Sequence, residues 1–197
     1  MLSRQASTGF TLVEVMVTVF VVAIGLLTAA GLQAVSKKAA FDALQRTTAS
    51  VIAQDMLERI RANPTMQENY VLLGAEVKGP ISGVTCGGGT ACSKLELVSY
   101  DLSRWWMSLD GAAETISSGA TTANAGGLRS PVGCISQSGL VVNVVVAWRG
   151  LSAIRQASDG DDDPTSDTCG EGQSPDPYEK TGTQSYRRVL RLQAHIR

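Results

Sequence analysis

Histidine is almost absent from this chain of 197 residues, which contains only His195. The sequence therefore offers no histidine cluster for a metal centre, and we find no nucleophile elbow or phosphate-binding glycine loop. His195 lies at an outward position of a terminal strand, where an exposed bystander is a better interpretation than a general base. The sequence predicts a protein that is not an enzyme and needs no cofactor or metal.

An excess of positive charge is also lacking. The chain has 17 Lys and Arg residues against 18 Asp and Glu residues, which gives a formal net charge of −1. Proteins that bind nucleic acid through bulk electrostatics carry a strongly basic surface. We therefore expect no nucleic-acid partner.

Charge is missing from the run of 26 residues between Phe10 and Val35, with Glu14 as the one exception. About 20 apolar residues are enough to span a bilayer as a helix, so residues 10–35 are predicted to form a transmembrane segment. A carboxylate in such a segment costs on the order of 2.5–3.5 kcal/mol at mid-membrane and usually has a partner. A secretory signal carries its cleavage site after its apolar run, whereas the candidate site here, Gly9–Phe10, precedes it. The apolar run would thus stay on the mature protein.

Cleavage between Gly9 and Phe10 would supply a partner for Glu14. The new α-amine of Phe10 would be largely protonated at neutral pH. It lies too near the start of its own helix to reach Glu14 easily, but the amine of a neighbouring subunit could reach it. The alternative is an ordinary signal anchor whose Glu14 side chain extends to the membrane interface.

The order Gly-Phe-Thr-Leu-x-Glu at residues 9–14 resembles the type IV pilin and pseudopilin class. The resemblance implies that residues 1–9 are a prepilin leader, and that a prepilin peptidase cuts after Gly9 and methylates Phe10. It also implies that Glu14 draws an incoming subunit into register at an inner-membrane assembly platform. Before assembly the chain would cross the inner membrane once, with its head in the periplasm, and afterwards it would be part of the pilus on the cell surface.

Other stretches are similar to the PilV family of minor pilins. These are AIGLLTAAGLQ (23–33) and ASVIAQDMLERIRANP (49–64). Three later stretches, 99–109, 141–148 and 186–193, are also similar and follow one another in the same order as in that family. The resemblance implies a minor pilin that primes pilus assembly together with other minor pilins. It would end in a complex at the pilus tip with a tip protein, and would serve twitching motility and adhesion.

Gly31 stands where many major pilins carry a proline, which favours a minor subunit.

Three alternatives to this function stay open. A minor pseudopilin of a type II secretion system would share the same physics, and a tip module could instead bind a ligand directly. A plain signal-anchored protein is the third alternative, with Thr28-Ala29-Ala30 as a poor signal-peptidase site.

The helix is expected to continue past the membrane through residues 36–63. Proline and glycine are absent between Ser36 and Asn63, and Pro64 disfavours helical geometry at the residue before it. This half is amphipathic, because the residues of one face recur with helical spacing: Phe41, Leu44, Thr48, Ile52, Met56 and Ile60.

Four cysteines, Cys86, Cys92, Cys134 and Cys169, all follow the apolar segment. An even number on one side of a membrane anchor indicates disulfides formed in an oxidising compartment. A zinc site is the competing interpretation, but the spacing of Cys86 and Cys92 is wide for one and no histidine lies nearby. Among the three pairings, Cys86–Cys92 with Cys134–Cys169 is favoured because the first two cysteines flank a short glycine turn.

The head, residues 65–197, is predicted to contain one amphipathic helix at 94–109. Ser93 and Glu96 fit a capping box at its start. Trp105 is expected in the core, whereas Trp106 is expected at the core, at its rim or at a partner contact. The apolar face of this helix is expected to consist of Leu95, Val98, Leu102, Trp105 and Leu109.

Two strands are predicted from alternation, at 140–148 and 189–196, and two weaker ones at 71–77 and 83–86. The first is expected to be central because both of its faces are partly apolar. The overall prediction is an α+β, pilin-like fold: a long spine helix with a small antiparallel head sheet. One face of the first strand is expected to carry Leu140, Val142, Val144, Val146 and Trp148, and the inward residues of the last are expected to be Leu190, Leu192, Ala194 and Ile196.

Two segments are predicted to be loops. Residues 111–127 are rich in Gly, Ser, Thr and Ala without periodicity and are expected to be mobile, and 159–178 is acidic with three prolines. Part of the second segment resembles a calcium loop, with candidate ligands at Asp159, Asp161, Asp163 and Asp167. Pro164 then replaces the turn glycine and Gly170 replaces the bidentate glutamate, so a solvated loop is the favoured interpretation.

Overall fold

The computed structural model describes residues 9–72, 85–87, 89, 91–112, 114–119, 121–155, 168–171, 177–178 and 184–196. The chain divides into two compact units, Met1–Phe41 and Asp42–Arg197. Within the described residues of the first unit there is one element, the start of helix α1 (Leu12–Ala62). The elements that make up the head all belong to the second unit.

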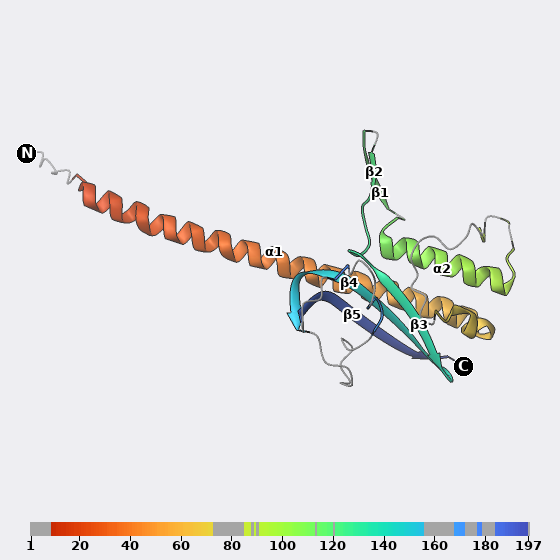
Figure 1. Cartoon of the computed structure of the whole chain (residues 1–197). Coiled ribbons are helices and arrows are strands. Elements are labelled where there is room, and N and C mark those ends of the chain that lie inside the picture. The colour runs from red at the N-terminus through yellow and green to blue at the C-terminus, as the bar shows by residue number, and fades with distance from the viewer. Residues whose placement is uncertain are drawn as a thin grey trace, which may run out of the picture. The chain divides into compact units, whose positions relative to one another are not determined.

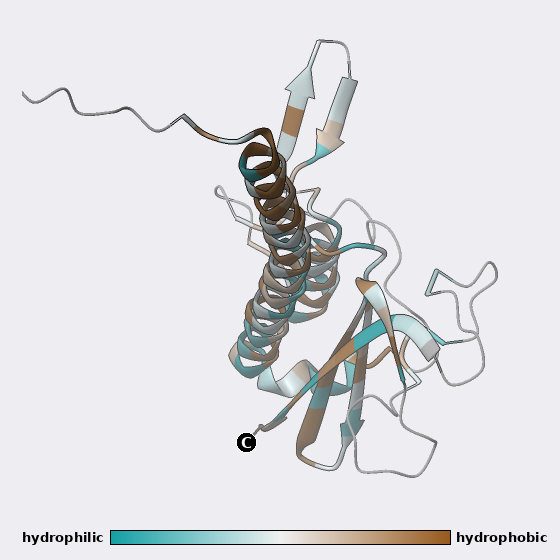
Figure 2. Cartoon of the chain, turned by 90° about the vertical axis from the view of Figure 1, so that its left-hand side faces the viewer, coloured by the Kyte–Doolittle hydropathy of each residue, from teal (hydrophilic) through white to brown (hydrophobic). Residues whose placement is uncertain are grey.

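Helix α1 begins and ends close to the predicted positions. Thr11 precedes it, Asn63 follows it, and the 3-10 helix η1 (Pro64–Tyr70) begins at the expected proline. Its first part is strongly hydrophobic (Figure 2), and by length and composition it is the one helix in the described chain that could cross a membrane. The large apolar side chains between Phe10 and Val35 are each at least 50% exposed in the isolated chain.

The face of α1 that enters the head core was predicted in part. Ile52, Met56 and Ile60 are buried, whereas Phe41 and Leu44, which follow the same helical spacing, are exposed in the isolated chain. The core face begins instead at Gln45, whose side chain binds backbone groups of Gly127 and Arg129. Periodicity identifies a helix face, but it does not show where along the helix the head begins to cover it.

Helix α2 (Lys94–Asp110) lies beside the second half of α1 (Figure 1). Its capping box is present as predicted, and Gly111 ends it in the left-handed conformation, with φ +76°. Trp105 is fully buried and donates its Nε1–H to the carbonyl of Ile52 at 3.1 Å, while Trp106 lies at the core rim. Leu95 is 55% exposed, so the buried part of the predicted apolar face begins at Val98.

The main sheet contains three antiparallel strands in the order β3–β4–β5, with bounds Val132–Ser138, Val141–Arg155 and Gln184–His195. β4 is central, as predicted, and its alternate residues Val142, Val144, Val146 and Trp148 are buried. Leu140 is exposed in the turn after Gly139, so its inclusion in the predicted strand was wrong. β4 and β5 are both longer than predicted, and β3 was not predicted at all.

Two further loop or strand predictions need correction. Residues 111–127 are not an irregular loop, because they contain a hairpin of strands β1 (Thr115–Ser118) and β2 (Thr121–Asn124). Residues 73–84 lie outside the described residues, so most of the two weaker strand predictions is not covered. Val71, Leu72, Thr85 and Cys86 do not belong to strands.

The head has two hydrophobic clusters, one on each face of the main sheet. The larger joins α1, α2 and the inward face of the sheet, with Met56, Trp105 and Val144 near its centre. The smaller lies on the other face, where Val145 and Ala147 pack with Cys169 and Tyr178. β4 is therefore buried on both sides, which explains its nearly continuous apolar sequence.

Candidate assembly site

The first turn of α1 is organised by Thr11. Its side-chain Oγ1 accepts the backbone N–H of Glu14 at 3.2 Å, and its carbonyl accepts the N–H of Val15 at 3.2 Å. Thr11 is thus the N-cap of α1, and Glu14 stands three residues into the helix. The cap fixes the point where the helix begins, and with it the position of Glu14 relative to Phe10.

Phe10 and Glu14 lie on the same side of this first turn. Together with Val15 and Thr18 they line one hollow in the surface, and Phe10 is 82% exposed. The positive end of the helix dipole favours an anion here, so the Glu14 carboxylate is well placed electrostatically. It is the only charged side chain between Gly9 and Ser36. This end of the chain therefore presents one carboxylate on an otherwise apolar helix.

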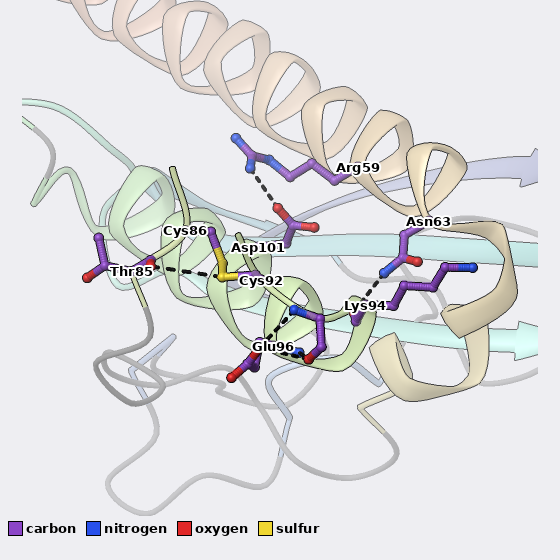
Figure 3. The surroundings of a disulfide bond; sticks show 9 residues. Arg59, Asn63, Thr85, Cys86, Cys92, Lys94, Glu96 and Asp101 are labelled. Atoms are coloured by element: carbon purple, nitrogen blue, oxygen red, sulfur yellow. Dashed lines mark hydrogen bonds and ion pairs between the residues drawn. A yellow bond between two sulfur atoms is a disulfide. The ribbon is translucent and has the colours of Figure 1, made fainter. Parts of the chain in front are cut away.

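In the head, a polar network connects α1, η1 and α2. Asp101 on α2 is 4% exposed and accepts bonds from Arg59 at 2.9 Å and from the Tyr70 hydroxyl at 2.7 Å. Asn63 contacts the Tyr70 hydroxyl at 3.5 Å and donates to the carbonyl of Lys94 at 3.0 Å. Figure 3 shows Arg59 pointing to Asp101 from the last turn of α1, and Asn63, the residue after the helix, pointing to Lys94.

This network shifts the pKa values of two members. Burial, and then the bond to Asp101, raise the pKa of the Tyr70 hydroxyl above its ordinary value. Burial lowers the pKa of the Arg59 guanidinium, but the bonds to Asp55 and Asp101 outweigh it and raise the pKa overall. The network therefore favours a neutral tyrosine and a charged arginine between the two helices.

The disulfide between Cys86 and Cys92 lies directly before α2 (Figure 3). Ser93, the next residue, accepts the N–H of Glu96, and the Glu96 carboxylate accepts the N–H of Ser93 at 2.8 Å. This last bond and a second one from the Ser93 hydroxyl to the Glu96 carboxylate, also at 2.8 Å, lower the pKa of the Glu96 carboxyl. The disulfide thus closes a small loop at the residue where the helix starts.

The second disulfide joins Cys134 on β3 to Cys169, which gives the same pairing that the sequence favours. Arg187 of β5 is 2% exposed and donates to the Cys169 carbonyl from Nε at 3.0 Å and from a terminal nitrogen at 2.6 Å. Another of its nitrogens contacts the Glu171 carboxylate at 3.2 Å. Tyr178 donates its hydroxyl to the Ser130 carbonyl at 3.2 Å. The segments around Cys169 and Tyr178 are thus held on the outer face of the sheet.

Two family models match the chain. The prokaryotic N-terminal methylation motif matches residues 4–30, and the model described as Type IV pilin Tt1218 matches residues 31–103. The chain belongs to the type IV pilins. No curated protein and no solved structure gives a significant match. The family assignment therefore rests on the leader, the spine helix and the first part of the pilin head.

The remaining site predictions have different outcomes. His195 is exposed on β5, and among the described residues no group of three His, Cys, Asp or Glu side chains could hold a metal ion. The candidate calcium ligands Asp159, Asp161, Asp163 and Asp167 lie outside the described residues. Burial of Asp101 and Arg187 was not predicted, because neither residue belongs to a motif.

Proposed function

We propose that this type IV pilin is a minor pilin of the PilV type, which helps to prime pilus assembly and ends in a complex at the pilus tip. The single observation that carries the proposal is the lone Glu14 carboxylate beside Phe10, inside a segment that matches the methylation motif. Gly31, in place of the proline of many major pilins, supports a minor subunit. Other minor pilins and a pilus tip protein would be its partners.

Assembly would proceed in three physical steps. A prepilin peptidase would cut after Gly9 and methylate Phe10, which leaves the apolar helix with a cationic amine at its start. The helix would then leave the lipid and pack against other spine helices at the inner-membrane platform. A carboxylate in that apolar setting is costly unless it is paired, so Glu14 would select the register in which it meets a neighbour's amine.

The two disulfides support a head that is exposed to an oxidising compartment before assembly. On this basis the head would be periplasmic while the helix is in the inner membrane, and it would lie on the cell surface in the finished pilus. Function would come from assembly, with no catalytic step by the pilin itself.

Glu14→Ala in the full chain, expressed in a piliated host, tests this proposal. The variant should insert into the membrane and be cleaved normally, but its amount in sheared filaments should fall at least tenfold. Glu68→Ala, which removes an exposed carboxylate from the head, is the matched control and should leave incorporation unchanged. Wild-type incorporation of the Glu14→Ala variant would contradict the pairing role.

Deletion of the gene separates the pilus from the type II secretion alternative. A minor pilin predicts loss of piliation and twitching with normal protein secretion. Loss of secretion with intact twitching would instead assign the chain to the pseudopilins.

A further inference from the structure

The β1–β2 hairpin has little support from the rest of the described head. All residues of both strands are exposed, and the hairpin forms a sheet of its own, apart from β3–β5. Figure 1 shows it projecting away from α2 and the main sheet. An isolated two-stranded hairpin is marginally stable in water, so this arm stands to gain stability from an external contact.

The base of the hairpin is firmly attached to the end of α2. Asn124 donates to the carbonyl of Asp110 at 3.2 Å and to its carboxylate at 2.7 Å. Gly111 and Gly127 both have positive φ, and a Cβ on Gly127 would lie 2.3 Å from the backbone N of Gly111. The two backbones therefore touch at this point, and only glycine fits. The direction of the arm is fixed by α2.

Within the part of the head that the structure describes, strands β1 and β2 carry none of the usual protection against strand pairing. Exposed edges are commonly protected by charged residues, by proline or by a covering element. Residues 115–128 contain no charged residue and no proline. Most of the hairpin is accordingly pale in Figure 2, which marks neutral hydropathy. The edges are open to a strand of similarly low charge.

The two faces of the hairpin differ. Thr115, Ser117, Thr122 and Asn124 share one face, which is lined with hydroxyl and amide groups. On the other face Ile116 lies directly opposite Ala123, and Ile116 is 65% exposed. Burial of this apolar pair would add to the main-chain hydrogen bonds of an added strand.

We propose that the β1–β2 hairpin is a strand-addition arm that pairs, through an outer edge, with a strand in the head of an adjacent pilin-class subunit. This inference rests on the proposed function, because it needs subunits that are already held side by side. It names a contact surface in the head, in addition to the pairing at Glu14.

The size of the hairpin argues for a neighbour in the filament over a free ligand. Four-residue strands are too short to supply the roughly 800 Å² per partner of a stable interface. Subunits joined through their spine helices gain an effective concentration of about millimolar order, so a weak contact between their heads can form. A soluble ligand would lack that advantage.

Site-specific photo-crosslinking of the full chain in piliated cells tests the proposal. A photoreactive residue replaces Ser117 on β1 or, separately, Thr122 on β2, because each position samples one edge. The matched control is the same residue at Ser138, which is exposed at the far end of β3. At least one hairpin position should crosslink to another pilin-class subunit ten times more than Ser138 does, and Glu14→Ala should abolish that product.

Recovery of the chain in sheared filaments is measured in the same cells, so that two failures can be told apart. If the chain is in the filaments but neither hairpin position crosslinks to a pilin subunit, the strand-addition arm is wrong and the proposed function stands. Crosslinks to non-pilin proteins alone, or a pilin crosslink that persists in Glu14→Ala, also overturn the arm. Absence of the chain from filaments contradicts the proposed function and the arm together.

Discussion

The two disulfides are expected to contribute unequally to the stability of the head, and this can be measured. The perturbation is removal of one bridge at a time by replacing both of its cysteines with alanine. Cys134–Cys169 joins residues 35 positions apart, whereas Cys86–Cys92 joins residues only 6 apart. A crosslink that closes a longer loop removes more conformational entropy from the unfolded chain.

The loop lengths give the expected magnitudes. Loop closure predicts a loss of unfolding free energy of about 4 kcal/mol for the longer loop and about 2 kcal/mol for the shorter one. The Cys134–Cys169 disulfide has a second effect on stability, because it holds Cys169 where its carbonyl accepts a hydrogen bond from the buried Arg187. Hydrogen bonds to a charged group contribute about 1.5–3 kcal/mol. Removal of Cys134–Cys169 should therefore cost at least twice as much as removal of Cys86–Cys92.

Urea unfolding of the full chain in detergent micelles measures both losses. Trp105, Trp106 and Trp148 all lie in the head, so tryptophan fluorescence reports its unfolding without interference from the apolar helix. The free energies follow from linear extrapolation to zero urea. An equal loss in the two variants, or a larger loss for Cys86–Cys92, would refute the assigned role of the Cys169 segment.

Three further predictions concern the head core. Gly133→Ala should destabilise the head by about 1–3 kcal/mol in urea unfolding, because its Cβ would lie 2.4 Å from the buried Trp105 ring; unchanged stability would contradict this packing. Asp101→Ala should cost about 2–4 kcal/mol, since it removes the short bond of the Tyr70 hydroxyl and the buried carboxylate that Arg59 contacts; the loss should shrink in a Tyr70→Phe background, and full additivity would argue against the network. The pKa of Tyr70 is raised in the folded head, so the contribution of the neutral Tyr70 hydroxyl to stability should be complete below about pH 10 and decline above it. In unfolding curves measured at increasing pH, Tyr70→Phe should flatten this decline in the free energy of unfolding. An identical decline in the variant would count against the raised pKa.

The elements with strong local signals were predictable from the sequence. The Ser93–Glu96 capping box located the start of α2, Pro64 located the end of α1, and alternation identified the core of β4. These signals depend on residues that are close in sequence, so tertiary contacts do not alter them. The N-terminal motif is local in the same sense, and its family model matches residues 4–30, whereas the roles of Gly9, Phe10 and Glu14 stay predictions.

Elements that depend on distant contacts were not predictable. β3 contains Gly133, which weakens a strand pattern, but the glycine is needed because the Trp105 ring packs against it. The β1–β2 hairpin has the composition of a loop and becomes recognisable only through its attachment to Asp110. Arg187 lies on the face of β5 that is exposed further along at Arg191, and it is covered by the Cys169 segment, which a disulfide joins to β3.

The most direct test of the central claim is the N-terminal sequence and intact mass of the protein recovered from its native membrane. Processing as a type IV pilin predicts a chain that begins at Phe10 with one added methyl group and keeps the whole apolar helix. A chain that still begins at Met1, or one that begins after Ala30, would contradict assembly through the Phe10 amine and Glu14.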